Sequence, residues 1–94
     1  MRLKDFEIKA IKDAVYSLDK NSKIYLFGSR VDDSKRGGDI DLIIISKKLT
    51  SGDKYKIYSG ITKVIDEQKI DIIINNGKNK NLFVENSLKE SLQL

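Results

Sequence analysis

Three aspartates are the side chains of this sequence best suited to chemistry, because each interrupts a run of isoleucine and leucine. Asp39 and Asp41 are separated by a single isoleucine, and Asp71 follows 30 residues after Asp41 between two further isoleucines. Alternate residues of a β-strand project to the same face, so Asp39 and Asp41 are expected to lie side by side. Neighbouring carboxylates on an apolar strand are costly unless a cation neutralises them, and a hard divalent cation bound through oxygen atoms meets this need.

A Gly-Ser pair lies upstream of these aspartates. Gly28 and Ser29 end an apolar run and are separated from Asp39 by nine residues. Their backbone N–H groups could bind the phosphates that usually accompany such a cation. Each feature has an ordinary interpretation when taken alone: a turn, a solvated edge, or a charge that protects an edge strand. If the strands are neighbours, however, the three aspartates converge into one site.

The sequence contains neither histidine nor cysteine. This excludes Ser-His catalysis, imidazole or thiolate metal sites, and disulfides. Carboxylates, lysines and hydroxyls must therefore carry any chemistry. Metal-assisted phosphoryl or nucleotidyl transfer remains open to such a chain, because it depends mainly on positioning and on stabilisation of charge.

The hydrophobic pattern predicts a small sheet backed by helices to position these groups. Apolar residues recur at helical spacing over 3–18, and β-prone runs lie at 23–27, 39–46 and 70–74. The polar segment 30–38 has room for one helical turn. Further helices are expected from about 53 to 68 and over 79–94, where the last residues could instead form a short extended tail. The predicted fold class is α/β (α+β), with a small mixed β-sheet backed by helices.

The pattern also predicts which side chains form the core. The helix at 53–68 is expected to bury Tyr55, Tyr58, Ile61 and Ile65. The last helix is expected to use Phe83, Val84 and Leu88, with Leu92 as a further candidate. The isoleucines at 43–45 are apolar on both strand faces, which predicts a strand end that is covered on both sides.

Composition indicates one domain at 1–94 with a mildly basic surface. Against 14 Asp and Glu there are 18 Lys and Arg, spread along the chain, which gives a net charge of +4. Such a balance suits anionic partners such as nucleotides or RNA, but the bias is small, and it favours a solvated lysine-rich surface over nucleic acid as a direct ligand. The lysines at 47, 48, 78 and 80 are assigned to solvated loops. No signal peptide and no apolar run of transmembrane length is visible, so a cytoplasmic protein without membrane contact is expected.

The stretches 26–30 and 38–43 resemble the signature of the DNA polymerase β-like nucleotidyltransferase superfamily. In particular they are similar to the minimal nucleotidyltransferases (MNT), a small prokaryotic group that often accompanies HEPN-domain proteins. The resemblance covers nearly the whole chain, from the leading helix to the strand with the third aspartate. It implies a nucleotidyltransferase fold like the palm of polymerase β.

The resemblance assigns a metal role to the three aspartates. It implies that Asp39 and Asp41 ligate two Mg²⁺ ions, and that Asp71 completes the shell of one ion and helps to deprotonate an acceptor hydroxyl. Three carboxylates this close cannot all ionise cheaply, so one of their pKa values is expected to rise when no metal is bound.

The same resemblance assigns the nucleotide to the upstream turn. Gly28 and Ser29 would hold the triphosphate, and Arg30 could steady a phosphate. Gly38 departs from the serine that many relatives carry before the first aspartate, which removes at most one hydrogen bond.

The implied function is Mg²⁺-dependent transfer of an NMP, with AMP from ATP as the leading case, to a hydroxyl acceptor. Among minimal members the acceptor implied is a tyrosine of a partner HEPN toxin, which would make this chain the antitoxin of a toxin-antitoxin system. Larger relatives carry an acceptor-binding domain that this sequence lacks, so the acceptor is expected to be recognised in trans or within a homo- or hetero-oligomer. Two alternatives stay open: a non-catalytic module that neutralises its partner by binding, and the catalytic subunit of a two-chain nucleotidyltransferase with a helical partner.

Overall fold

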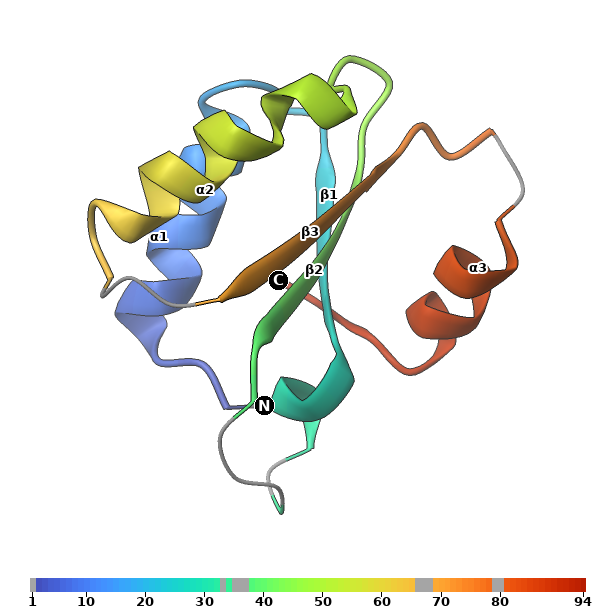
Figure 1. Ribbon diagram of the computed structural model, residues 1–94, viewed down its shortest axis with the longest axis horizontal. Coiled ribbons are helices and arrows are strands. Elements are labelled where there is room, and N and C mark those ends of the chain that lie inside the picture. Colours follow the sequence, from blue (N-terminus) through green and yellow to red (C-terminus); the bar gives the residue numbers. More distant parts are fainter. Residues whose placement is uncertain (1, 33, 35–37, 66–68, 79–80) are drawn as a thin grey trace.

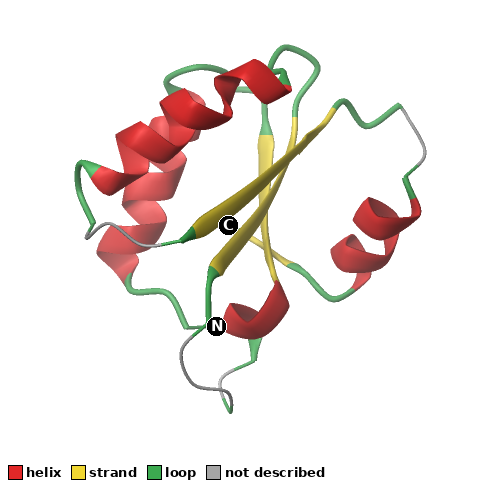
Figure 2. Ribbon diagram, viewed as in Figure 1, coloured by secondary structure: helices red, strands yellow, loops and turns green. Residues whose placement is uncertain are grey.

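A computed structural model describes residues 2–32, 34, 38–65, 69–78 and 81–94. Figures 1 and 2 show a central sheet with helices on both sides. In chain order, its elements are α1 (Asp5–Tyr16), β1 (Lys23–Phe27), the 3₁₀ turn η1 (Gly28–Val31), β2 (Ile40–Ile45), η2 (Ser51–Asp53), α2 (Lys54–Thr62), β3 (Ile70–Asn75), α3 (Leu82–Lys89) and β4 (Leu92–Gln93).

The four strands form one mixed sheet in the order β3-β2-β1-β4. Strands β2 and β3 are parallel, while β1 is antiparallel to both of its neighbours, β2 and β4. Helices α1 and α2 pack together on one face of the sheet, and α3 lies on the other (Figure 1). The predicted fold class, a small mixed sheet backed by helices, is confirmed.

The main core lies between the sheet and the α1–α2 pair. Alternate residues of β2 enter it, and Ile40, Leu42 and Ile44 are completely buried. Gly60 of α2 lets the two helices approach closely, because a Cβ there would lie 3.1 Å from the Cβ of Ala14. The sheet face that carries the odd-numbered residues of β2 therefore points away from this core.

The opposite face is only partly covered. Ile43 is completely buried and Val84 of α3 nearly so, while the rings of Phe27 and Phe83 meet edge to face with their centroids 6.0 Å apart. The prediction that both faces are covered over residues 43–45 is thus confirmed for Ile43 and Ile44, while Ile45 is only partly buried. Phe83 itself stays largely exposed, so its expected place in the core is only partly right.

Helix α2 is shorter than predicted, and its buried face is partly the predicted one: Ile61 is buried and Tyr58 partly buried, as expected. It ends at Thr62, and its buried residues are Ile57 and Ile61, while Tyr55 is 77% exposed. The prediction that Tyr55 is buried is wrong, because residues two positions apart, such as Tyr55 and Ile57, lie on opposite sides of a helix. Ile65 is buried as expected but follows the helix. The rest of the predicted helix, 66–68, lies outside the described residues.

The last helix is also shorter than predicted, and the extended tail is confirmed. The side chain of Asn81 accepts a hydrogen bond from the Val84 N–H and caps α3. After Lys89 the chain turns back, and β4 pairs with β1. The predicted start at 79–80 lies outside the described residues. Within the described ranges, the helices are too short and too polar to cross a membrane.

Candidate active site

Two of the three aspartates lie directly opposite each other on the parallel strands. Asp41 of β2 is the register partner of Asp71 of β3, on the sheet face that α1 and α2 do not cover. Helix α3 reaches this end of the sheet over β1, where Phe83 contacts Phe27, the register partner of Asp41. Asp71 stays exposed and Asp41 is half-buried. The sequence predicted that the three aspartates converge, and the parallel register of β2 and β3 brings Asp41 and Asp71 together.

Asp39 lies just before β2 and is linked to Asp71 through a lysine. The Lys69 ammonium is 3.4 Å from Asp39 Oδ2 and 3.9 Å from Asp71 Oδ2. The backbone brings these residues together, because the Ile40 N–H donates to the Lys69 carbonyl over 3.3 Å. Sequence reasoning missed Lys69, although alternation along the strand already places it on the face of Asp71.

The electrostatics of the site centre on Asp41. Its partial burial, followed by the charge and hydrogen bond of Asp71 and by the charge of Asp39, raises its pKa to about 6. The contacts with Asp39 and Asp71 in turn raise the pKa of Lys69. This confirms the expectation that one carboxyl of the trio resists ionisation when no metal is present, and it identifies that carboxyl as Asp41.

The Gly-Ser turn lies against the Asp41 carboxylate. Gly28 has a φ of +78°, and a Cβ at this position would overlap Asp41 Oδ2. Both the backbone conformation and the close approach therefore call for glycine. The turn begins η1 at Gly28 itself, two residues earlier than the segment in which a helical turn was expected. The sequence-predicted phosphate and metal residues are thus neighbours in space.

Gly38 has a structural reason for departing from serine. Its φ is +90°, and a Cβ there would overlap the Ser29 hydroxyl oxygen. Ser29 therefore fills the space that a side chain at position 38 would take. The hydroxyl at this point of the site therefore comes from Ser29 of the Gly-Ser turn and not from position 38.

Two arginines hold the turn through backbone carbonyls. Arg2 donates to Ser29 O over 3.0 Å and to Asp32 O over 3.1 Å. Arg30 donates to Gly38 O over 3.2 Å and to Arg2 O over 3.0 Å. Arg2 gave no sequence signal, since its role depends on the approach of the N-terminal segment. At least part of the Arg30 guanidinium supports the loop, and its contact with a phosphate stays a prediction.

The donor chemistry of this site fits a hard divalent cation. Three carboxylates supply only oxygen atoms, the ligands that Mg²⁺ prefers, and an ammonium already bridges two of them. Within the described ranges, no three acidic, His or Cys side chains lie close enough to one another to hold a metal ion by themselves. The residues therefore suit a cation that is completed by other oxygen ligands such as phosphates, rather than one enclosed by protein.

A mixed sheet with converging aspartates beside a glycine turn is the arrangement expected of a nucleotidyltransferase. The chain matches the family model described as polymerase beta, nucleotidyltransferase, over residues 9–94. It therefore belongs to this family, whose members use nucleoside triphosphates and a divalent metal. A search of curated proteins found no match.

Proposed function

We propose that this protein is a Mg²⁺-dependent nucleotidyltransferase that moves an NMP, with AMP from ATP as the leading case, to a hydroxyl acceptor and releases pyrophosphate. The observation that carries the proposal is the pairing of Asp41 with Asp71 on parallel strands, with the Gly28 backbone against Asp41. This puts acidic oxygens and a backbone turn side by side at one open end of the sheet.

The proposed roles follow from these positions. Asp39, Asp41 and Asp71 would hold the cation, which would offset the charge of the triphosphate and of the attacking oxygen. Gly28 and Ser29 would support the triphosphate from the turn, next to Asp41. Asp71 is the most exposed of the trio, and it would accept the proton of the acceptor hydroxyl. Arg30 would add a positive charge near the phosphates.

The proposal also concerns the molecule that accepts the nucleotide. A tyrosine of a HEPN-domain toxin is favoured by the resemblance to minimal nucleotidyltransferases, and this chain would then act as an antitoxin. The open sheet end around Asp71 supports an acceptor that comes from another molecule. In a second candidate function the protein neutralises its partner by binding alone, and in a third it is the catalytic subunit of a two-chain enzyme.

Transfer of label from [α-³²P]ATP tests the activity. The protein is incubated with ATP, Mg²⁺ and a co-expressed candidate HEPN partner, and incorporated label and released pyrophosphate are both measured. Asp39→Asn and Asp41→Asn should each abolish transfer, while Asp13→Asn, on the exposed face of α1, should not. Absence of label from the wild-type reaction, with the partner still neutralised by the Asp39→Asn/Asp41→Asn variant, would overturn the enzymatic proposal in favour of the binding module.

A further inference from the structure

A large open cleft lies at the end of the sheet away from the three aspartates. It encloses about 830 Å³ between the start of β1, the end of β2 and the turn after β3. Strand β2 separates the two places, since Asp41 lies near its beginning and Ile45 lines the cleft at its end. At about 3.3 Å per residue the separation is on the order of 15 Å. The cleft is therefore distinct from the site of proposed transfer.

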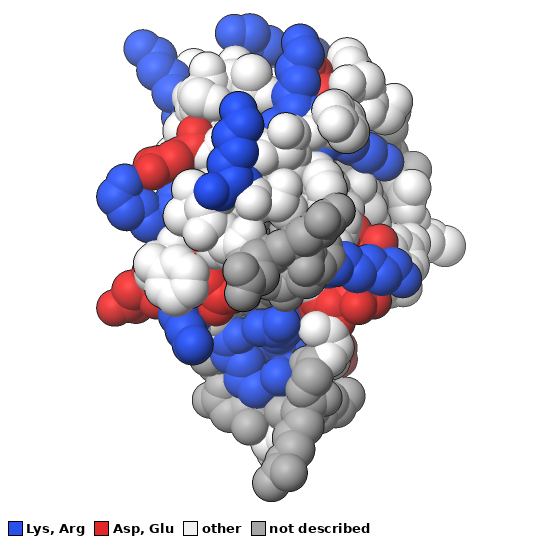
Figure 3. All heavy atoms as spheres, turned by 60° about the vertical axis from the view of Figure 1, so that its left-hand side comes forward, with Lys and Arg blue, Asp and Glu red and all other residues white. Residues whose placement is uncertain are grey.

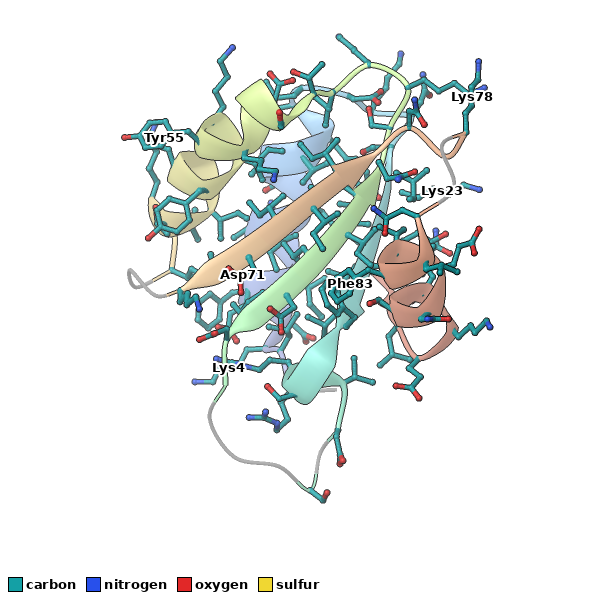
Figure 4. All side chains as sticks on the ribbon, turned by 45° about the vertical axis from the view of Figure 1, so that its right-hand side comes forward. Lys4, Lys23, Tyr55, Asp71, Lys78 and Phe83 are labelled. Atoms are coloured by element: carbon teal, nitrogen blue, oxygen red, sulfur yellow. The ribbon has the colours of Figure 1, made fainter. Side chains whose placement is uncertain are left out.

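Four lysines converge on this cleft from three segments of the chain. They are Lys23, Lys47, Lys48 and Lys78. Figure 4 shows Lys23 and Lys78 on the side of the molecule away from Asp71. None of the four ammonium groups has a carboxylate partner within 4.0 Å in the part of the chain that the structure describes. Like charges gathered without partners repel one another, so an anion in the cleft would be stabilising.

The carboxylate that lines the cleft is already engaged by the fold. Asp19 is buried and accepts hydrogen bonds from the Ser46 hydroxyl over 2.5 Å and from the Asn21 N–H over 3.0 Å. These bonds lower the pKa of Asp19, and the nearby charge of Lys48 contributes less. Among the described residues of the lining, one negative charge therefore faces four positive charges. Elsewhere, on the face formed by α1 and α2, basic and acidic side chains are interspersed (Figure 3).

The lining favours a phosphate-bearing ligand over a protein. Protein interfaces have few lysines and depend on aromatic or aliphatic anchors, whereas Ile45 is the one large apolar residue among the described residues of the lining. The volume far exceeds that of a single phosphate. The described lining also holds no aromatic side chain on which bases could stack, so its lysines would contact phosphates, and such contacts do not depend on base sequence.

We propose that this cleft, lined by Lys23, Lys47, Lys48 and Lys78, binds the phosphate backbone of a single-stranded nucleic acid without sequence preference. This goes beyond the proposed nucleotidyl transfer and does not depend on it. It also revises the assignment of Lys47, Lys48 and Lys78 to solvated loops.

Fluorescence anisotropy with a labelled 12-nucleotide RNA of mixed sequence, in EDTA, tests the proposal. EDTA removes any metal-dependent binding at the aspartates. Lys47→Gln/Lys78→Gln should weaken binding about tenfold at low salt and should reduce the slope of log K against log salt by about 1.4, since each phosphate contact on a single strand contributes about 0.7. Lys56→Gln/Lys63→Gln removes the same charge from two exposed lysines, one in α2 and one at its C-terminal cap, and it should leave both quantities nearly unchanged.

Three further comparisons decide the outcome. Asp39→Asn/Asp41→Asn should bind the RNA at least as well as the wild type does, so that a failed transfer reaction leaves this proposal standing. Equal losses in the two lysine pairs would overturn the cleft assignment. Equally tight binding of ATP, inorganic tripolyphosphate or a poly-glutamate peptide would overturn the assignment to a nucleic-acid backbone. Thermal melts of all variants establish that the fold is kept.

Discussion

Asp41 and Asp71 face each other across the parallel β2–β3 pair, each the register partner of the other. Partial burial and the second carboxylate raise the pKa of Asp41 to about 6. The residues that serve the proposed chemistry are therefore a cost to the fold when no cation is bound. The free energy of unfolding and the affinity for a cation should therefore both change when these aspartates are replaced.

Asp41→Asn should stabilise the metal-free protein at neutral pH. The folded-state pKa of about 6 exceeds the unfolded value of about 3.9, so the wild type loses stability as pH rises through this window. The gain in the variant should be about 1 kcal/mol at pH 7, after allowance for solvent screening of a half-buried group, and should vanish below pH 4. Urea unfolding in EDTA at pH 3.5, 5 and 7 measures it. A variant that is less stable than wild type at pH 7 would contradict the described electrostatics.

The sequence was sufficient to predict the aspartates and the class of fold, because strand alternation and apolar runs are local signals. Asp39 and Asp41 share a face because they are two residues apart, and Asp71 required only that its strand be a parallel neighbour. Tyr55 was misplaced because a helical stripe can be drawn through either Tyr55 or Ile57 when the partner surface is unknown.

Other parts of the site could not be predicted because they depend on tertiary approach. Arg2 reaches Ser29 only because the N-terminal segment folds back over the turn. The lack of room for a side chain at Gly38 depends on the position of the Ser29 hydroxyl. The lysines of the cleft come from three segments of the chain that are far apart in the sequence, so their proximity is not visible in any one segment.

Gly28→Ala should be destabilising by about 1–3 kcal/mol and should abolish transfer. The φ of +78° is unfavourable for alanine, and the added Cβ would overlap the Asp41 carboxylate. Gly52→Ala is the matched control, because a Cβ there would lie 3.5 Å from the Thr50 hydroxyl and meet ordinary contact. Chemical denaturation and the labelled-ATP reaction report the two effects. In an Asp41→Ala background the destabilisation should shrink, and an unchanged value would show that the overlap is not the cause.

Lys69→Met should strengthen binding of Mg²⁺ or Mn²⁺ up to about fivefold. The ammonium contacts Asp39 and Asp71, so it competes with a cation for the same oxygens. An exposed ion pair contributes at most about 1 kcal/mol, which sets the limit on the gain. Titration calorimetry with Mg²⁺, or Mn²⁺ binding followed by electron paramagnetic resonance, measures the affinity. Lys69→Arg keeps the charge and should behave like wild type; a weaker affinity in Lys69→Met would show that the lysine supports the cation instead.

Ser46→Ala should destabilise the protein by about 1–3 kcal/mol at pH 7 and by less at pH 2. The Ser46 hydroxyl donates to buried Asp19 and accepts from the N–H groups of Lys48 and Leu49, and loss of such a centre leaves buried polar groups unpaired. The lowered pKa of Asp19 means that its contribution is present above the unfolded value of about 3.9 and is lost as pH falls through the folded value. Ser51→Ala, at an exposed position in η2, serves as the control, and urea unfolding across pH 2–7 is the measurement. A loss that stays constant over this range would mean that the hydroxyl acts on the backbone alone and that its bond to Asp19 contributes nothing to stability.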